Sequence, residues 1–408
     1  MKLTGVILLL ALALPVLAEK PGTWPIERLQ TEVPKHRVLD DSNPVHSILF
    51  EGEPIDGKQT EVFAFYASPK TLGKSDAAGP FPGIVLIHGG GGTAFSNWAE
   101  MWAGRGYAAI SMDLAGMRPP PPVKNHHTHK RGERKKLETG GLDHSHVEKF
   151  QNIQTETRDD DWPFHAAAIV MRAHSLLDSF PETDPDRTAV TGISWGGYTT
   201  CLAASLDDRF QCAIPVYGCG FLHEGESVQK PQIDRLGEHR DAWIAAYDPG
   251  SHLAKCTVPT FWVNGTHDKH YVLDSYAKSY SLVKSPKTFR IKPLMGHSHP
   301  AGWAPKEIGI YVDSILKNGT PLPDVGELKT ENGTVRARVK SETDITKVEL
   351  HFTEDDGPRT NRKWKSLPGT YQKSVARVDG LPETANTWLL TITDERDAMV
   401  TTEVGSRD

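Results

Sequence analysis

The sequence is poor in cysteine, has no excess of positive charge, and lacks the common nucleotide-binding motifs. Its formal net charge of −6 argues against a nucleic-acid partner. Neither G-x-x-x-x-G-K nor a G-x-G-x-x-G after a strand is present, so no phosphate cradle or dinucleotide site is indicated. The spacing of the cysteines is not that of a zinc site, and we expect no metal and no cofactor. The four cysteines are Cys201, Cys212, Cys219 and Cys256.

An apolar run begins directly after the second residue of the chain. It is shorter than the roughly 18 residues that a membrane-spanning helix needs, so no stable membrane anchor is expected. Val16 and Ala18 suit the −3 and −1 positions of a cleavage site, which predicts a secretory signal peptide over residues 1–18. A secreted or periplasmic protein could form up to two disulfides. Cys201 and Cys212 lie in apolar runs, however, so buried free thiols are the other interpretation.

The pattern of the remaining chain changes at a proline-bearing linker over residues 318–324. Before it, apolar strands alternate with helices, which predicts an α/β fold with a mostly parallel sheet over residues 43–317. Residues 116–160 form a long insertion, interpreted as a lid or rim. Short strands with turn signals predict a small β-sandwich of immunoglobulin or fibronectin type over residues 325–408. Residues 19–42, rich in proline and charge, are expected to be an extended arm.

A G-x-S-x-G motif centred on Ser194 stands between a β-type run and a helix rich in small residues. Strand, G-x-S-x-G and helix together are the context of a nucleophile elbow. The serine must sit on a strained turn with its hydroxyl above the sheet, and side chains at Gly192 or Gly196 would collide with neighbouring backbone. Ser194 is therefore the predicted nucleophile.

A run of four glycines follows His88 at the end of the first buried strand. It matches the oxyanion motif whose backbone amides stabilise a developing negative charge. The amides of Gly90 and Gly91, with that of Trp195, are the predicted oxyanion hole. A flexible loop or a phosphate cradle is the alternative, but the position of the run in chain order favours the oxyanion hole.

The acid partner of a serine nucleophile is expected after a later strand of the same sheet. Asp268 lies in a turn at the C-terminal end of a predicted strand and is the preferred acid. His267, His270 and Asp274 lie nearby as alternatives, and Asp274 has a helical setting.

The general base is expected after the last strand of the α/β region. His297 and His299 both lie there, and His297 is preferred because it follows the strand end more closely. The order Ser194, Asp268, His297 is the one that the α/β-hydrolase fold uses. His299 stays open as the alternative base.

The insertion is rich in histidine and positive charge. It contains His126–His129, the basic run Lys130–Lys136, and the pair His144 and His146. Metal binding by these histidines is one interpretation, but no carboxylate or cysteine has tight ligand spacing with them. A solvated loop is preferred.

Four stretches of the α/β region carry a family resemblance, and they are Leu86–Gly92, Asp184–Gly197, Pro215–Gly220 and Asn264–Asp268. Over about residues 80–322 the chain resembles secreted bacterial α/β hydrolases of the acetyl xylan esterase, dienelactone hydrolase and prolyl-oligopeptidase type. The resemblance implies the α/β-hydrolase fold and a triad of Ser194, Asp268 and His297. The His-Ser-His at 297–299 departs from the usual Gly-His-Gly and keeps the base open. The tail, with Trp364, is similar to that of PhoPQ-activated pathogenicity-related proteins.

These observations predict an exported serine esterase that hydrolyses acetyl or similar small esters through an acyl-enzyme. The expected partner is a small ester or an acetylated polysaccharide, and no residue pattern indicates an oligomeric state. A serine peptidase of the prolyl-oligopeptidase clan is one alternative, although no repeated propeller blades precede the α/β region. A non-catalytic envelope binding protein on the same fold is another. A scaffold without activity would not need the serine, the acid, the base and the glycine run together.

Overall fold

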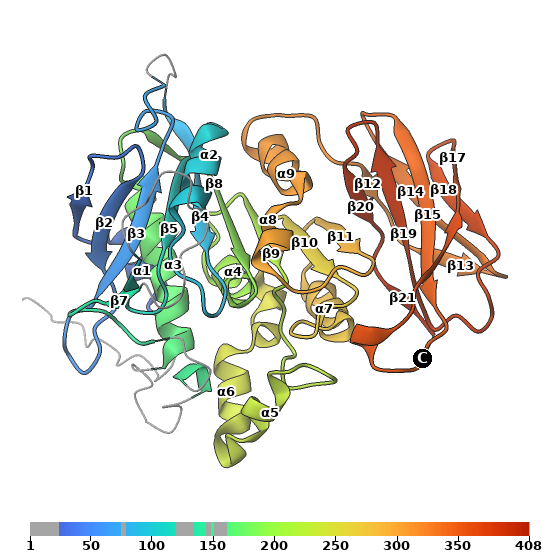
Figure 1. The fold of residues 1–408 in the computed structure, drawn as a ribbon, viewed down its shortest axis with the longest axis horizontal. Coiled ribbons are helices and arrows are strands. Elements are labelled where there is room, and N and C mark those ends of the chain that lie inside the picture. The colour runs from blue at the N-terminus through green and yellow to red at the C-terminus, as the bar shows by residue number, and fades with distance from the viewer. Residues whose placement is uncertain (1–23, 75–78, 120–133, 144–147, 151–160, 408) are drawn as a thin grey trace, which may run out of the picture.

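The computed structural model describes residues 24–74, 79–119, 134–143, 148–150 and 161–407. One long sheet runs through the molecule and forms its centre (Figure 1). Its parallel strands, in spatial order, are β5 (Ala108–Met112), β4 (Phe81–Ile87), β8 (Thr183–Ile193), β9 (Cys212–Val216), β10 (Thr260–Gly265) and β11 (Lys287–Lys292). The mostly parallel sheet with helices confirms the predicted α/β architecture.

Helices cover both faces of the parallel strands. On one face pack α3 (Trp162–Asp178) and α4 (Trp195–Leu206), and on the other pack α2 (Ser96–Gly104) and α9 (Lys306–Leu316). Every residue of β4, β9 and β10 is consequently buried. Burial on both faces explains the continuous apolar runs in the sequence, because a strand between two helical layers has no face exposed to solvent.

The N-terminal residues 24–42 are folded onto the α/β part rather than extended as an arm. Helix α1 (Ile26–Thr31) packs against α3, and β1 (His36–Asp40) pairs antiparallel with β2 (His46–Glu51). Trp24 and Leu29 anchor the segment, because both side chains are buried. The proline- and charge-rich composition concealed these two anchors.

Strands β2 and β3 (Glu61–Ala67) continue the sheet as an antiparallel pair next to β5. Their connection turns at Asp56 and Gly57, which have φ angles of 51° and 71°. Left-handed backbone at two consecutive residues is typical of an Asp-Gly turn, as the sequence predicted.

The C-terminal part forms two layers of antiparallel strands. One layer contains β12, β14, β18, β17 and β13, and the other contains β20, β19, β15, β16 and β21. The bounds of these strands are β12 Asp324–Val325, β13 Lys329–Glu331, β14 Thr334–Lys340, β15 Ile345–Thr353, β16 Lys365–Pro368, β17 Thr370–Gln372, β18 Val375–Asp379, β19 Thr387–Asp394, β20 Met399–Thr401 and β21 Gly405–Ser406.

The C-terminal layers are not a separate unit, because one of them continues the central sheet. Strand β20 pairs with β11 at Phe289 and Thr401, and Figure 1 shows the C-terminal strands beside β11. An edge strand such as β11 otherwise presents unpaired backbone groups, and β20 covers them. The linker predicted from the sequence therefore joins two regions that share a sheet.

Glu307 of α9 ties the α/β part to the C-terminal strands. Its side chain is almost fully buried, and one carboxylate oxygen accepts the backbone N–H of Met399 at 2.8 Å. The other oxygen lies 3.1 Å from the guanidinium of Arg290 on β11. A buried carboxylate shared by a strand of each region couples their folding.

Glu307→Ala is expected to lower the free energy of unfolding by about 3–5 kcal/mol, because it leaves the Arg290 charge buried without its partner. Urea unfolding followed by tryptophan fluorescence measures the change. The matched control is Glu327→Ala, which removes an exposed ion pair with Lys329 at 3.8 Å, and such pairs contribute about 1 kcal/mol or less. Equal losses for the two variants would contradict the coupling role of Glu307.

All four cysteines are free and buried. The sequence allowed either disulfides or buried free thiols, and the structure contains buried free thiols. Burial raises the pKa of the Cys256 thiol to about 11, so this thiol is protonated and poorly reactive at neutral pH.

Candidate active site

Ser194 lies at the sharp turn between β8 and α4. Its φ is 62°, a left-handed conformation that costs a non-glycine residue of order 1–3 kcal/mol. Glycine is required on both sides of it. A Cβ at Gly192 would lie 2.3 Å from the carbonyl oxygen of Gly196, and a Cβ at Gly196 would lie 2.1 Å from that of Ile87. The turn thus raises the serine at the carboxyl end of the sheet.

His297 lies between Ser194 and Asp268. Its Nε2 is 2.8 Å from Ser194 Oγ, and its Nδ1 is 2.8 Å from Asp268 Oδ2. The other carboxylate oxygen of Asp268 accepts the backbone N–H groups of His270 at 2.7 Å and Tyr271 at 3.0 Å. Asp268 is buried, and these two donors fix its orientation towards the imidazole. The structure therefore brings together the three residues that the sequence singled out.

The loops that carry Asp268 and His297 are bound to each other. They follow the parallel neighbours β10 and β11, so both leave the sheet at the same edge. The Thr266 hydroxyl accepts the N–H of Leu294 at 2.9 Å. A Cβ at Gly265 would lie 2.0 Å from the carbonyl oxygen of Met295, so only glycine permits this approach.

His299, the alternative base, faces the glycine run instead of the carboxylate. Its Nε2 accepts the backbone N–H of Gly89 at 3.2 Å, and its ring packs 5.7 Å from that of Phe95. Burial, together with the charge of His297, lowers the pKa of His299 to about 4. His299 is thus neutral at physiological pH, with Nε2 engaged as an acceptor. This geometry favours His297 as the base.

The alternatives to Asp268 make other contacts. His267 Nε2 lies 2.9 Å from the carbonyl oxygen of Arg362, on the C-terminal part. Asp274 pairs with Arg359 at 2.5 Å, also on the C-terminal part. His270 packs its ring 4.5 Å from that of His297. His267 and Asp274 therefore both contact the connection between β15 and β16.

The glycine run that was predicted to form the oxyanion hole lies against Trp195. A Cβ at Gly90 would be 2.7 Å from Cδ1 of Trp195, and Gly91 has a φ of 74°. His88 fixes the start of the run, because its Nε2 accepts the N–H of Leu114 at 2.9 Å and its Nδ1 donates to the Gly89 carbonyl at 2.8 Å. Both ring nitrogens are used, so His88 fixes the position of Gly89, the first residue of the run.

Two tyrosines support His297, and the sequence reasoning assigned them no role. The Tyr217 ring lies 4.6 Å from that of His297, and its hydroxyl donates to the Gly296 carbonyl at 3.3 Å. The Tyr271 ring stacks at 6.0 Å with an interplanar angle of 22°. Tyr217 directly follows β9 at the catalytic edge, and Tyr271 stands three residues after Asp268. These positions next to the catalytic edge and the acid were the sequence signals that could have identified the two tyrosines.

A pocket of about 470 Å³ opens beside the glycine run. Its walls are the glycines, Phe95, and the short helix α8 (His299–Trp303). Arg134, from the 116–160 insertion, also lines the pocket and donates to the carbonyl of Gly92. The interpretation of the insertion as a lid or rim stays a prediction. The histidines of the insertion, at 126, 127, 129, 144 and 146, lie outside the described residues.

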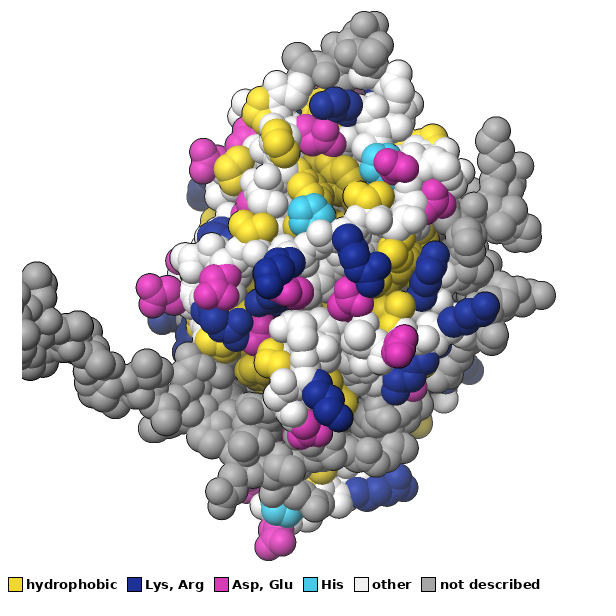
Figure 2. All heavy atoms as spheres, turned by 90° about the vertical axis from the view of Figure 1, so that its left-hand side faces the viewer, with side chains coloured by type: hydrophobic (Ala, Val, Ile, Leu, Met, Phe, Trp, Pro, Cys, Tyr) yellow, Lys and Arg dark blue, Asp and Glu magenta, His cyan; other side chains and the backbone are white. Residues whose placement is uncertain are grey.

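A second hollow, of about 420 Å³, lies at the other edge of the sheet. Figure 2 shows it as a depression with hydrophobic side chains on its floor and histidine side chains beside it. Its lining includes Tyr66 of β3, and Phe180 and Glu182 from the segment that leads into β8. Parallel strands begin there, whereas Ser194 stands where β8 ends, so this hollow is separate from the catalytic edge.

Comparison with known proteins matches two family models. Residues 40–228 match the model described as acetyl xylan esterase (AXE1), and residues 166–315 match the model described as the prolyl oligopeptidase family. Among curated proteins, the acetyl esterase Axe7A of Xylanibacter ruminicola is 21% identical over 251 residues. That alignment covers 59% of this chain and 53% of the relative, so the chain matches about half of the relative's length.

Two solved structures show the same arrangement of strands and helices. An acetyl xylan esterase from Paenibacillus sp. R4 superposes with a TM-score of 0.54 at 18% identity, covering 71% of this chain and 92% of that one. Acetyl xylan esterase 1 from Thermoanaerobacterium sp. gives 0.50 at 15% identity, covering 67% and 86%. The fold is that of the α/β hydrolases. The comparisons thus support the hydrolase type that the sequence predicted.

Two further sequence predictions concern the tail and metal binding. The family matches end at residue 315, so the similarity of the C-terminal tail to PhoPQ-activated pathogenicity-related proteins stays a prediction. Among the residues that the structure describes, no group of three or more histidine, cysteine, aspartate or glutamate side chains is placed to hold a metal ion.

Proposed function

We propose that this chain is an exported serine esterase that removes acetyl or similar small acyl groups from carbohydrate. The observation that carries the proposal is the hydrogen-bond chain from Ser194 through His297 to Asp268, 2.8 Å at each step. A nucleophile, a base and an orienting acid at these distances, with the nucleophile on an elbow, are what covalent acyl transfer requires. The acetyl xylan esterase family match and the acetyl esterase relative support the choice of acyl group and substrate.

In the proposed mechanism, His297 Nε2 takes the Ser194 proton while Oγ attacks the ester carbonyl carbon. Asp268 keeps the proton on Nδ1 and stabilises the imidazolium that forms. The amides of Gly90, Gly91 and Trp195 would receive the oxyanion of the tetrahedral intermediate. The imidazolium then protonates the leaving alcohol. Water, activated by the same histidine, cleaves the acyl-enzyme and releases the carboxylate.

Export and domain organisation complete the proposal. Residues 1–18, proposed as the signal peptide, lie outside the described residues. Within the described part of the chain, no helix combines the length and apolarity needed to cross a bilayer. We further propose residues 43–317 as the catalytic region, 318–324 as the linker, and 325–408 as a β-sandwich that shares the central sheet.

Acetylated xylan tests the substrate class, with p-nitrophenyl acetate as the small-ester reference. The mature chain is expected to release acetate from the polymer and nitrophenol from the reference ester, and Ser194→Ala is expected to release neither above background. Nitrophenol release without acetate release would overturn the carbohydrate substrate alone. A folded protein inactive on both would overturn the esterase.

The prolyl oligopeptidase family match over residues 166–315 favours a peptidase as the second candidate. Blocked dipeptide p-nitroanilides with proline or alanine before the scissile bond distinguish the two. The esterase proposal expects nitroaniline release no faster than that of Ser194→Ala. Serine-dependent release of nitroaniline that outpaces ester cleavage would replace the esterase with a peptidase.

A further inference from the structure

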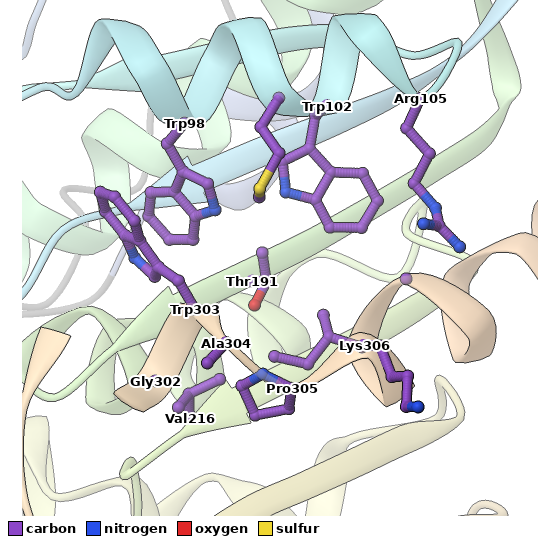
Figure 3. A pocket seen from close by; sticks show the side chains of 13 residues that line it. Trp98, Trp102, Arg105, Thr191, Val216, Gly302, Trp303, Ala304, Pro305 and Lys306 are labelled. Atoms are coloured by element: carbon purple, nitrogen blue, oxygen red, sulfur yellow. The ribbon is translucent and has the colours of Figure 1, made fainter. Parts of the chain in front are cut away.

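A further cavity of about 210 Å³, the inner cavity, lies between α2 and α9 and shares Trp303 with the pocket beside the glycine run (Figure 3). Figure 3 shows Trp98 and Trp102 projecting into it from α2, with Thr191 of β8 facing them. Val216 of β9 and Ile308 of α9 add apolar surface to the lining, and the exposed side chains of Arg105 and Lys306 line its solvent side. The apolar wall formed by Trp98, Trp102 and Val216 suits an aliphatic group better than a sugar.

Trp303 separates the two spaces. Its side chain lines both the pocket beside the glycine run and the inner cavity. It stacks on Trp98 with ring centroids 5.0 Å apart and an interplanar angle of 23°, and it meets Phe95 edge-on at 5.0 Å. Phe95 lines the pocket beside the glycine run, and Trp98 lines the inner cavity. The indole of Trp303 is therefore the partition between the two spaces.

The catalytic geometry indicates which part of an ester would face this partition. His297 must protonate the leaving oxygen, so the alcohol has to lie on the side of His297. His297 is surrounded there by Tyr217, His270 and Tyr271. The pocket bounded by Gly90, Gly91 and Trp303 lies on the glycine-run side. The acyl group is the part of the substrate left to occupy it.

We propose that Trp303 is a specificity-determining residue that limits the acyl chain to short groups by closing the inner cavity. This inference rests on the proposed esterase function and deepens it. With the indole removed, the inner cavity becomes an extension of the acyl pocket. A hexanoyl or octanoyl chain would then bury methylenes against Trp98, Trp102 and Val216, and each buried methylene contributes about fourfold to binding.

The test is a chain-length series of p-nitrophenyl esters, from acetate to octanoate, on the full mature chain. Trp303→Ala is expected to raise the ratio of kcat/KM for octanoate to that for acetate by tenfold or more over the parent. Trp303→Phe keeps a ring in the partition and is expected to change the ratio little. Because the readout is a ratio within one enzyme preparation, partial misfolding does not alter it.

Two further variants secure the interpretation. Trp303→Leu gives an intermediate opening if Trp303→Ala does not fold, and it should raise the ratio in the same direction. Ala304 lines the inner cavity, so Trp303→Ala combined with Ala304→Leu is expected to refill the space and return the ratio towards the parent value.

The outcomes separate this inference from the proposed function. Parent turnover of acetate with an unchanged ratio in Trp303→Ala and Trp303→Leu overturns the role of Trp303 alone. A parent enzyme that prefers octanoate to acetate also overturns it. A folded parent that cleaves none of the esters overturns the esterase function and this inference with it.

Discussion

Ser194→Ala is expected to lower kcat for p-nitrophenyl acetate by about 10⁴-fold or more, with little change in the urea unfolding midpoint. The substitution removes one heavy atom, the hydroxyl oxygen Oγ. That atom lies 2.8 Å from His297 Nε2 at the carboxyl edge of the sheet. The strained backbone at φ 62° is unchanged by the substitution. The substitution is therefore expected to lower kcat without lowering stability, and both quantities are measured on the same preparation.

Ser205→Ala is the matched control for this prediction. Ser205 lies on α4, the helix that follows the elbow, and its hydroxyl donates to the Cys201 carbonyl at 2.7 Å. The same atom is lost from the same helix, but away from His297, so turnover is expected to stay within about twofold of the parent. Activity of Ser194→Ala above about a tenth of the parent would contradict the assignment of Ser194 as nucleophile.

The second large effect is expected at His297 and not at His299. His297→Ala is expected to lower kcat by about 10⁴-fold, because no other base lies between Ser194 and Asp268 among the described residues. His299→Gln keeps an acceptor for the Gly89 N–H and is expected to cost less than about tenfold, since it disturbs only the position of the glycine run.

The pH dependence distinguishes the two histidines further. His299 has its pKa near 4, so its neutral form persists through the range in which ester hydrolysis is measured, and its loss should leave the acid limb of kcat/KM in place. The general base is required in its neutral form, so the acid limb of kcat/KM belongs to the residue that acts as the base. An acid limb that disappears in His299→Gln, or a kcat loss larger than that of His297→Ala, would transfer the base to His299.

Much of the catalytic edge could be predicted because its local chemistry is specific. A serine at positive φ needs glycines on both sides, and the contacts of Gly192 and Gly196 leave no room for a Cβ. Asp268 and His297 could be placed because polar residues that follow parallel strands meet at one edge of the sheet. The sequence did not decide between His297 and His299. The two histidines are only two positions apart, and the course of the backbone determines which ring faces the Asp268 carboxylate.

The relation between the two halves of the chain could not be predicted from local patterns. Pairing of β20 with β11 joins Thr401 to Phe289, more than a hundred residues apart in the chain. The composition of these two strands gives no sign that they pair with each other. Glu307 was an ordinary helix residue in the sequence and is a buried link in the structure. Trp24 and Leu29 were likewise concealed in a polar segment. Long-range pairing and single buried anchors are tertiary properties.

The most direct measurement is the mass of the intact mature protein after reaction with a fluorophosphonate, followed by peptide mapping. Such reagents modify a serine that an adjacent histidine activates. We expect the addition of a single phosphonyl group, located on Ser194, with no addition to Ser194→Ala and little to His297→Ala. Absence of modification in the folded parent, or modification at another residue, would contradict the claim that Ser194 is an activated nucleophile.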